Sequence, residues 1–267
     1  MTLRRRTIMG YIELEVKDYI AIVTLNNPRF NIMTREMMKE FAEVMKGVDM
    51  RNDVRVVLLR SACPDFSAGA DVSYVRALGD YENKNQSELQ AEMDLAGNMF
   101  ASIYNCRFPV VIAACGRMIG GGAVMAACSD VRVAAEGTIF SMAEVCIGWI
   151  GASAYMEALI PRRLARYYCF TGKPITAEEV RSYGGLLDVV PADQLEERAM
   201  KVCKDIAKMA PLAVQYFKAA MNNNDNEQFA EKFAQEYSYS MRHCRTEDFK
   251  EAIDAFMEKR KPEFKGR

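Results

Sequence analysis

Short apolar runs alternate with segments of helical periodicity along the first two thirds of the chain, and this order restricts the possible folds. Runs of buried-strand length occur at Val54–Leu59 and Pro109–Ala114, and we expect further strands at Val131–Ala134 and Thr138–Ser141. Glycine-rich loops follow strands, and helix-patterned segments lie between them. Such alternation favours an α/β fold with parallel strand pairing.

The N-terminal segment predicts two strands and a helix. Residues 11–25 contain two apolar stretches separated by Lys17-Asp18, which is typical of a tight turn. Thr34 is a suitable N-cap for a helix that reaches Val48. Residues 1–10 include three consecutive arginines, and we expect them to form a basic, disordered tail.

The remaining segments predict a polar loop and a helical C-terminal region. Asp80–Gln90 is polar, which predicts a loop before a helix over Ala91–Tyr104. From Thr176 onward the pattern is almost wholly helical, so we divide the chain into a core over residues 11–195 and a helical region over residues 196–267. The helices expected there are Asp193–Met209, Leu212–Asn222, Glu227–Arg242 and Thr246–Lys259.

The composition argues against several classes of function. A formal net charge of −1 gives no basis for a nucleic-acid partner, and no apolar run reaches the length of a membrane span. Eight cysteines without close pairs predict reduced thiols, and hence a cytoplasmic protein. His243 is the only histidine of the chain, so we expect neither a histidine-based triad nor a metal site.

Two glycine-rich loops are candidates for holding an anion. Ala68-Gly69-Ala70-Asp71 follows the Val54–Leu59 strand, and Gly120-Gly121-Gly122 opens a helix over Ala123–Cys128. The first N–H groups of a helix are unpaired and can stabilise a developing oxyanion. A glycine-rich turn also serves tight packing, and the pattern leaves both interpretations open. The chain contains no phosphate-loop, dinucleotide-binding or nucleophile-elbow motif.

Glu144 is a candidate for proton transfer because it lies in a largely apolar segment, Phe140–Gly148. A carboxylate among apolar neighbours holds a proton more tightly than one in water, which suits a proton shuttle. The alternative is an ordinary surface glutamate at a strand end.

Several motifs occur in a distinctive order between about Tyr11 and Lys265. Glu144 and Gly148 match a P-E-x-x-x-G element, except that Ala143 replaces the proline. The other motifs are Leu25-Asn26-Asn27-Pro28, Phe66-Ser67-Ala68-Gly69-Ala70-Asp71, Gly116 with Gly120-Gly121-Gly122, Thr171-Gly172-Lys173-Pro174-Ile175, and Phe256-Met257-Glu258-Lys259-Arg260. Together they resemble the crotonase, or enoyl-CoA hydratase/isomerase, superfamily.

The resemblance implies a fold, a substrate class and an assembly. The fold would be an α/β spiral of ββα repeats followed by a C-terminal helical trimerisation region. The substrate would be an acyl-coenzyme A thioester, with no separate cofactor because coenzyme A is part of the substrate. The chain would form a homotrimer or a dimer of trimers, with no nucleic acid or membrane as a partner.

The resemblance also implies roles for particular residues. The N–H groups of Ala70 and Gly121 would bind the thioester oxygen, and Glu144 would move the proton. Trp149 would help to shape the acyl pocket. The residues that would contact the substrate or its coenzyme A part are Arg29, Ala68, Gly69, Asp71, Gly120 and, from a neighbouring subunit, Lys259.

Departures from the family pattern affect the expected reaction. Hydratases of the family carry a glutamate where this chain has Val124, and other branches carry an aspartate where it has Ala152. Valine can neither activate nor orient water, so we expect double-bond isomerisation rather than standard hydration. An atypical hydratase, or a decarboxylase or hydrolase of acyl-CoA or acyl-carrier-protein thioesters, remains an alternative. A remote alternative is RNA binding through Lys259–Lys261.

Overall fold

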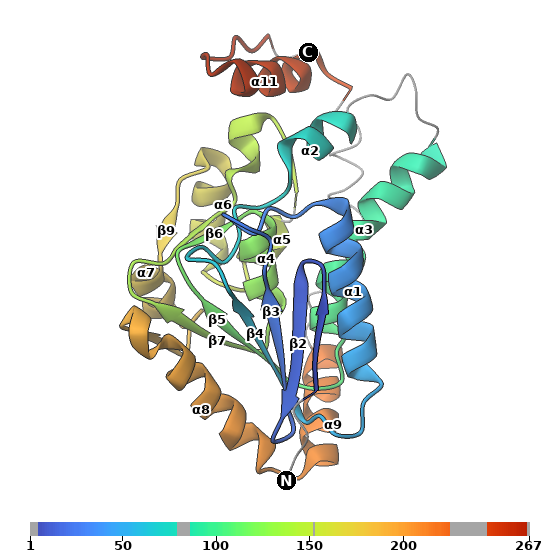
Figure 1. Cartoon of the computed structure of the whole chain (residues 1–267). Helices are drawn as coiled ribbons and strands as arrows, with labels where there is room; N and C mark the ends of the chain where they lie inside the picture. Colours follow the sequence, from blue (N-terminus) through green and yellow to red (C-terminus); the bar gives the residue numbers. More distant parts are fainter. Residues whose placement is uncertain (1–4, 79–85, 152, 225–244, 266–267) are drawn as a thin grey trace.

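The computed structural model describes residues 5–78, 86–151, 153–224 and 245–265 (Figure 1). Within these residues, the largest element is a seven-stranded sheet in the order β1-β2-β3-β4-β5-β7-β10. Strands β1 to β3 pair antiparallel, whereas β3, β4, β5, β7 and β10 pair in parallel, as predicted. The strands are β1 (Arg5–Met9), β2 (Ile12–Lys17), β3 (Ile20–Leu25), β4 (Val56–Ser61), β5 (Val110–Ala114), β7 (Val131–Ala135) and β10 (Asp188–Val190).

A smaller sheet lies beyond the ends of β4 and β5. In this part of the described chain, β6 (Arg117–Ile119) pairs in parallel with β8 (Ile139–Ser141), and β8 pairs antiparallel with β9 (Ile175–Thr176). Isolated parallel bridges join Met33 to Ala70 and Ser67 to Met118. These bridges place the loop that follows β4 between the segment before α1 and strand β6.

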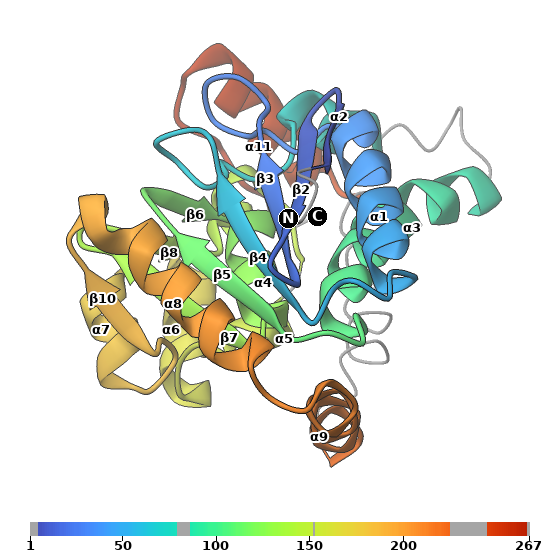
Figure 2. The ribbon, with the colours of Figure 1, turned by 60° about the horizontal axis from the view of Figure 1, so that its bottom comes forward.

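Helices cover both faces of the large sheet. Alternate residues of β4 enter two different cores: Val57 and Leu59 pack towards α1, α3 and α4, whereas Val56 and Leu58 pack towards α8. Figure 2 shows α8 crossing in front of β5 and β7. The helices are α1 (Arg35–Asp49), α2 (Val72–Leu78), α3 (Gln86–Tyr104), α4 (Gly121–Cys128), η1 (Ala143–Ile147), α5 (Ser153–Met156), α6 (Arg162–Thr171), α7 (Ala177–Ser182), η2 (Ala192–Gln194), α8 (Leu195–Ala207), α9 (Pro211–Asn224) and α11 (Glu247–Glu258).

Helix α1 begins and packs as its sequence predicts. The Thr34 side chain accepts a hydrogen bond from the Met37 N–H, so Thr34 is the N-cap. The apolar positions recur every three or four residues and form one buried face. The buried residues are Met37, Met38, Phe41, Val44, Met45 and Val48.

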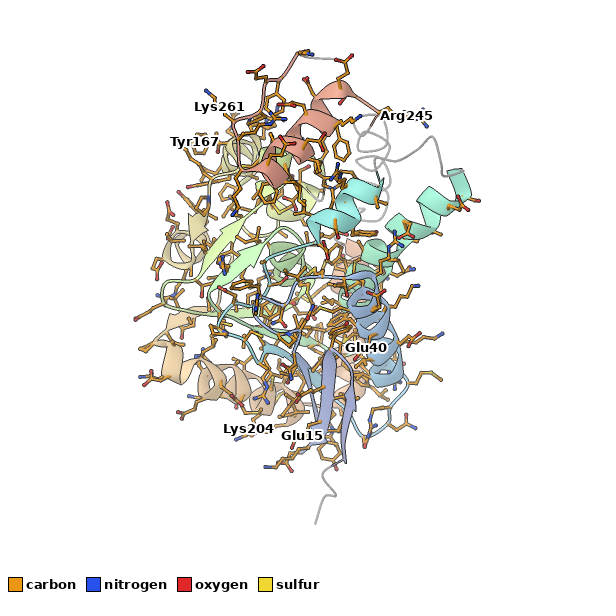
Figure 3. All side chains as sticks on the ribbon, turned by 45° about the horizontal axis from the view of Figure 1, so that its top comes forward. Glu15, Glu40, Tyr167, Lys204, Arg245 and Lys261 are labelled. Atoms are coloured by element: carbon orange, nitrogen blue, oxygen red, sulfur yellow. The ribbon has the colours of Figure 1, made fainter. Side chains whose placement is uncertain are left out.

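The prediction of a disordered tail over residues 1–10 is wrong for Arg5–Met9, which form β1 and pair with β2. The turn after this strand is held by a distant side chain. Glu40 of α1, labelled in Figure 3, accepts hydrogen bonds from the Tyr11 N–H at 3.0 Å and the Ile12 N–H at 2.8 Å. Because the anchor comes from another element, the local sequence gave no sign of it.

Two further boundaries differ from the predictions. Helix α3 begins at Gln86, so the end of the expected Asp80–Gln90 loop is helical, while residues 80–85 lie outside the described residues. Strand β10 interrupts the region expected to be helical from Thr176 onward. The expected helix at residues 227–242, and His243, lie outside the described residues. None of the helices in the described ranges is long and apolar enough to cross a membrane.

Candidate active site

The two glycine-rich loops meet where β4 and β6 end. The Ser67 N–H donates to the Arg117 carbonyl at 3.0 Å, and the Ser67 carbonyl accepts from the Ile119 N–H at 3.0 Å. A Cβ placed on Gly122 would lie 3.1 Å from the Ser67 carbonyl oxygen. The loop that begins at Ser67 therefore runs alongside β6 and against the first turn of α4.

The peptide between Gly69 and Ala70 has a defined orientation. The Gly69 carbonyl accepts a hydrogen bond from the Met33 N–H at 2.9 Å. In a planar trans peptide the C=O and the following N–H point in opposite directions, so the Ala70 N–H points away from Met33. The β6–α4 turn packs against the same loop, since a Cβ on Gly69 would lie 3.1 Å from the Ile119 carbonyl oxygen.

The Gly121 N–H belongs to the unpaired first turn of α4. Gly120 is the N-cap, with φ 51° and ψ −114°, a conformation that favours glycine. The first hydrogen bond of the helix joins the Val124 N–H to the Gly120 carbonyl. Among the described residues, neither the Ala70 N–H nor the Gly121 N–H donates a hydrogen bond to another protein group. Ala70 is exposed and Gly121 is partly exposed.

Met33 contacts the residues that carry both amides. Its backbone pairs with the chain on either side of Ala70, and a Cβ placed on Gly121 would lie 2.5 Å from its sulfur atom. Met33 itself is buried. The structure thus brings together Ala70 and Gly121, which are far apart in the sequence.

Glu144 lies against the same turn. Strands β6 and β8 run in parallel and end together, and the Gly120 N–H donates to the Ser141 carbonyl at 2.8 Å. Glu144 follows in the first turn of η1 rather than at the end of a strand. A Cβ placed on Gly120 would lie 2.5 Å from Glu144 Oε1, so the carboxylate packs directly on the Gly120 backbone.

Apolar side chains line the inner side of the α4 turn. Val124 is buried one turn into α4. Phe100 of α3 lies 3.3 Å from where a Cβ on Gly121 would be, and its ring centroid is 6.2 Å from that of Tyr155. The position where a hydratase of the family would carry its second glutamate is therefore occupied by a buried apolar side chain.

The outer residues that sequence reasoning assigned to the substrate lie in different settings. The Ala68 N–H donates to the Phe30 carbonyl at 2.9 Å, which places the exposed Arg29, with φ 79°, on the neighbouring loop. The Asp71 carboxylate accepts hydrogen bonds from the Ser73 N–H at 2.8 Å and the Ser73 hydroxyl at 2.6 Å, and so it caps α2.

Trp149 and Lys259 are associated with α11, which lies beyond α2 in Figure 1. The Trp149 ring packs on Phe249 of α11 at a centroid distance of 5.7 Å, and the Trp149 backbone N–H donates to the Glu144 carbonyl at 2.9 Å. Trp149 thus joins the Glu144 turn to the C-terminal helix. Lys259 ends α11 in a left-handed conformation with φ 55° and is exposed. No hydrogen bond within the described ranges joins Lys259 or Arg29 to the loop around Ala70.

An ion pair fixes the outer edge of the site. Arg117 of β6 binds Asp65 of the loop that follows β4 through its side chain at 2.7 Å and its backbone N–H at 2.8 Å. The side-chain hydrogen bond from Arg117 holds the pKa of Asp65 below its ordinary value. The guanidinium also lies 4.7 Å from the centre of the Phe30 ring. Arg117 thus joins β6 to the loop that contains Asp65 and Ala68 and to the neighbouring loop that contains Phe30.

Sequence reasoning missed Asn31 and Ser67, which are both completely buried. Asn31 adopts φ 47°, and Asn is the residue after glycine that most readily accepts this conformation. The sequence feature that could have indicated Asn31 is its position four residues after Asn27, in a segment that sequence reasoning treated only as the end of a strand. Across the described residues, no group of three His, Cys, Asp or Glu side chains is arranged to hold a metal ion.

Comparison with known proteins identifies the family of this chain. The family model described as enoyl-CoA hydratase/isomerase matches residues 15–267. The short-chain-enoyl-CoA hydratase of Clostridium acetobutylicum is 30% identical, covering 97% of this chain and 99% of the relative. The (7aS)-7a-methyl-1,5-dioxo-2,3,5,6,7,7a-hexahydro-1H-indene-carboxyl-CoA hydrolase of Rhodococcus jostii is 28% identical, covering 95% of this chain and 96% of the relative.

A solved structure confirms the α/β crotonase fold predicted from the resemblance, while the trimerisation role of the C-terminal helices stays a prediction. The crystal structure of a probable enoyl-CoA hydratase from Mycobacterium smegmatis superposes with a TM-score of 0.79 at 27% identity, covering 88% of this chain and 95% of the other. The family model covers nearly the whole chain, including every loop described above. The chain therefore belongs to the enoyl-CoA hydratase/isomerase family and has its α/β crotonase fold.

Proposed function

We propose that this acyl-CoA-processing enzyme moves a carbon–carbon double bond of its substrate by proton transfer through an enolate. One observation supports the proposal: the loop that carries Ala70 and the Glu144 carboxylate both lie against the Gly120–Gly121 turn. Donors for an oxyanion and a single proton carrier are thereby adjacent. This is the smallest set of groups that the reaction requires.

In this proposal the N–H groups of Ala70 and Gly121 both donate to the thioester oxygen. They bind it more strongly when it carries the negative charge of the enolate than in the ground state. The N-terminus of α4 adds partial positive charge to the Gly121 side. Loss of one donor of this kind typically raises the barrier by about 3–4 kcal/mol.

Glu144 then moves the proton between two carbons. In a 3-enoyl-CoA its carboxylate removes a proton from the α carbon. The electron pair of that bond forms the enolate double bond, and the carbonyl π pair moves onto the thioester oxygen. The protonated Glu144 returns the same proton to the γ carbon as the enolate collapses, so that the double bond moves to the 2-position and no water is consumed. Buried Val124 supports isomerisation over hydration because it cannot activate water as a second glutamate would.

The test is Glu144→Gln, compared with Glu43→Gln on the exposed side of α1. We expect the wild type and Glu43→Gln to convert a 3-enoyl-CoA into the 2-enoyl-CoA. Chromatography measures the amounts of the two compounds over time. Glu144→Gln should keep its melting temperature and lose activity by about 100-fold to 10,000-fold, the range for a general acid–base group. Activity near the wild-type level would remove Glu144 from the mechanism.

A second candidate function is hydrolysis of a carboxyl-CoA compound. It is favoured by the hydrolase relatives of Rhodococcus jostii and Mycobacterium tuberculosis, which are 28% and 29% identical to this chain. Mass spectrometry of a panel of CoA compounds distinguishes the reactions. Isomerisation leaves the substrate mass unchanged, whereas hydrolysis adds one water to the products. A malonyl-type thioester in the panel would reveal decarboxylation by release of carbon dioxide.

We also infer an assembly and a location. A homotrimer or a dimer of trimers is supported by the exposed apolar face of α9. A cytoplasmic location is supported by the free thiols of the seven described cysteines, a state typical of reducing compartments. The proposed chemistry uses only acid–base and hydrogen-bonding groups, so we propose that it needs no cofactor besides the coenzyme A of the substrate.

A further inference from the structure

We propose that Ser67 is a positioning residue that holds the Ala70 and Gly121 amides at the spacing the enolate oxygen requires. The inference rests on the proposed function, since it assigns a role to a residue beside the two amide donors. Ser67 carries neither donor itself. It does contact the chain segments that carry both of them.

The backbone of Ser67 is fixed to the side of the site that carries Gly121. Its N–H and carbonyl bind Arg117 and Ile119 of β6, the strand that leads into the Gly120–Gly121 turn. A Cβ placed on Gly122 would lie 3.2 Å from Ser67 Cβ. A shift of Ser67 would therefore shift the start of α4 as well.

The hydroxyl of Ser67 acts on the side that carries Ala70. It donates to the Asn31 carbonyl at 2.7 Å and accepts from the Gly69 N–H at 3.1 Å. The Gly69 carbonyl is held independently by the Met33 N–H at 2.9 Å. Both peptide planes next to Gly69 are thus fixed, and the second of these planes carries the Ala70 N–H.

The acceptor of the Ser67 hydroxyl is itself rigid. The Asn31 side chain donates to the Ser61 hydroxyl at 2.8 Å and the Phe66 carbonyl at 3.0 Å, and it accepts from the Asn27 N–H at 2.7 Å. Buried hydrogen-bond networks with every member satisfied favour one arrangement of the chain. Ser67 thereby connects this network directly to the Gly69–Ala70 peptide.

Removing the hydroxyl would leave the Gly69 N–H without its acceptor in a buried setting. The Ala68–Gly69 peptide would then rotate to find another partner. Because Gly69 joins the two peptide planes, this rotation would leave the Gly69–Ala70 plane held by the Met33 N–H alone and let the Ala70 N–H tilt. Because a misplacement of about 1 Å at a reacting group can cost about 100-fold in rate, a small rotation is enough to matter. The Ala68 N–H would stay bound to the Phe30 carbonyl at 2.9 Å, and Arg29 and Lys259 would be unaffected, so we expect the binding of the coenzyme A part of the substrate to change little.

The experiment measures how strongly the site polarises a bound carbonyl. The probe is butyryl-CoA with carbon-13 at the thioester carbonyl, because it has no double bond to isomerise. Difference infrared spectroscopy reports the carbonyl stretch, which falls in frequency as hydrogen bonds to the oxygen strengthen.

The variants are Ser67→Ala and Ser67→Cys, the second of which keeps the size of serine but hydrogen-bonds weakly. The control is Ser129→Ala, which removes a buried hydroxyl bound to the Met125 carbonyl at 2.8 Å at the other end of α4.

We expect Ser67→Ala to lose at least half of the frequency shift seen in the wild type, and Ser67→Cys to lie in between. With a 3-enoyl-CoA substrate, kcat should fall about 100-fold while KM stays within about two-fold, as for a misplaced group. Ser129→Ala should match the wild type in both measurements. Wild-type shifts in both Ser67 variants would overturn the inference alone. No shift in the wild-type protein would instead overturn the proposed pair of amide donors.

Discussion

At the scale of single residues, Gly121 has the least room for a side chain of the residues in the proposed oxyanion site. A Cβ there would lie 2.5 Å from the Met33 sulfur and 3.3 Å from the Phe100 ring. We expect Gly121→Ala to push the first turn of α4 away from Ala70. The loss of one oxyanion donor raises the activation barrier by about 3–4 kcal/mol. The kcat of Gly121→Ala, measured with a 3-enoyl-CoA, should therefore fall roughly 100-fold to 1,000-fold.

The matched control is Gly47→Ala, because a Cβ on Gly47 of α1 would meet nothing within 4 Å. This substitution should leave kcat unchanged and raise the free energy of unfolding by about 0.5–1 kcal/mol, since alanine is the better helix former. If Gly121→Ala instead kept kcat within two-fold of the wild type, the Gly121 amide would have no part in catalysis.

The site residues differ in how far the sequence could predict them. Gly121 and Glu144 stand in motifs that resemble a known family, and the structure places both at one turn. Asn31 and Ser67 make their decisive hydrogen bonds to residues up to 36 positions away. Such long-range pairs leave no periodic pattern in the sequence, so burial and partners became visible only in the folded chain.

At the scale of elements, α9 has two faces of opposite character. Lys218 is buried and binds the Asp130 carboxylate at 2.7 Å and the Phe108 carbonyl at 3.1 Å, which anchors the helix to the core. The face turned away from the core exposes large apolar side chains, with exposed fractions of 62% to 72%. These are Leu212, Tyr216, Phe217 and Met221. An apolar face of this kind is typical of an interface between proteins.

If α9 mediates self-association, one charge on this face should disrupt it. We expect Phe217→Lys to lower the mass measured by light scattering from that of a trimer or hexamer towards that of a monomer, because the interface would bury an unpaired charge. The control is Met50→Lys at the end of α1, where the side chain is 75% exposed. An unchanged mass for Phe217→Lys would exclude this face as the interface.

The predicted and missed elements differ in what stabilises them. Strands β4 and β5 are buried along most or all of their length, so their apolar runs identified them. Strand β10 has only three half-buried residues and is ordered by pairing with β7. The first turn of α3 carries exposed polar side chains such as Ser87 and Glu88, so helical periodicity could not locate its start.

At the scale of the whole molecule, the large sheet separates two apolar cores, and each contains a buried cysteine. Cys106 lies in the core that contains α1, α3 and α4. Cys203 lies on the buried face of α8, in the core between α8 and the sheet. Burial raises the pKa of both thiols to about 12, whereas Cys146 is exposed. Only the thiolate reacts with iodoacetamide, so both buried thiols should be protected in the native protein.

The labelling rates of Cys106 and Cys203 therefore report whether the two cores unfold together. If the sheet makes them one cooperative unit, both cysteines should react at one common rate, that of global unfolding, while Cys146 reacts at once.

The pH dependence of the labelling rate shows whether the thiols react through global unfolding or in the native protein. An unfolded thiol titrates near pH 8.5, so labelling through unfolding should level off above about pH 9. Labelling of native thiolates with a pKa of about 12 should instead keep rising about tenfold per pH unit, since their ionised fraction stays small. Mass spectrometry of the two peptides between pH 7.5 and 9.5 separates these cases, and a Cys203 rate well above that of Cys106 would show that α8 detaches from the sheet on its own.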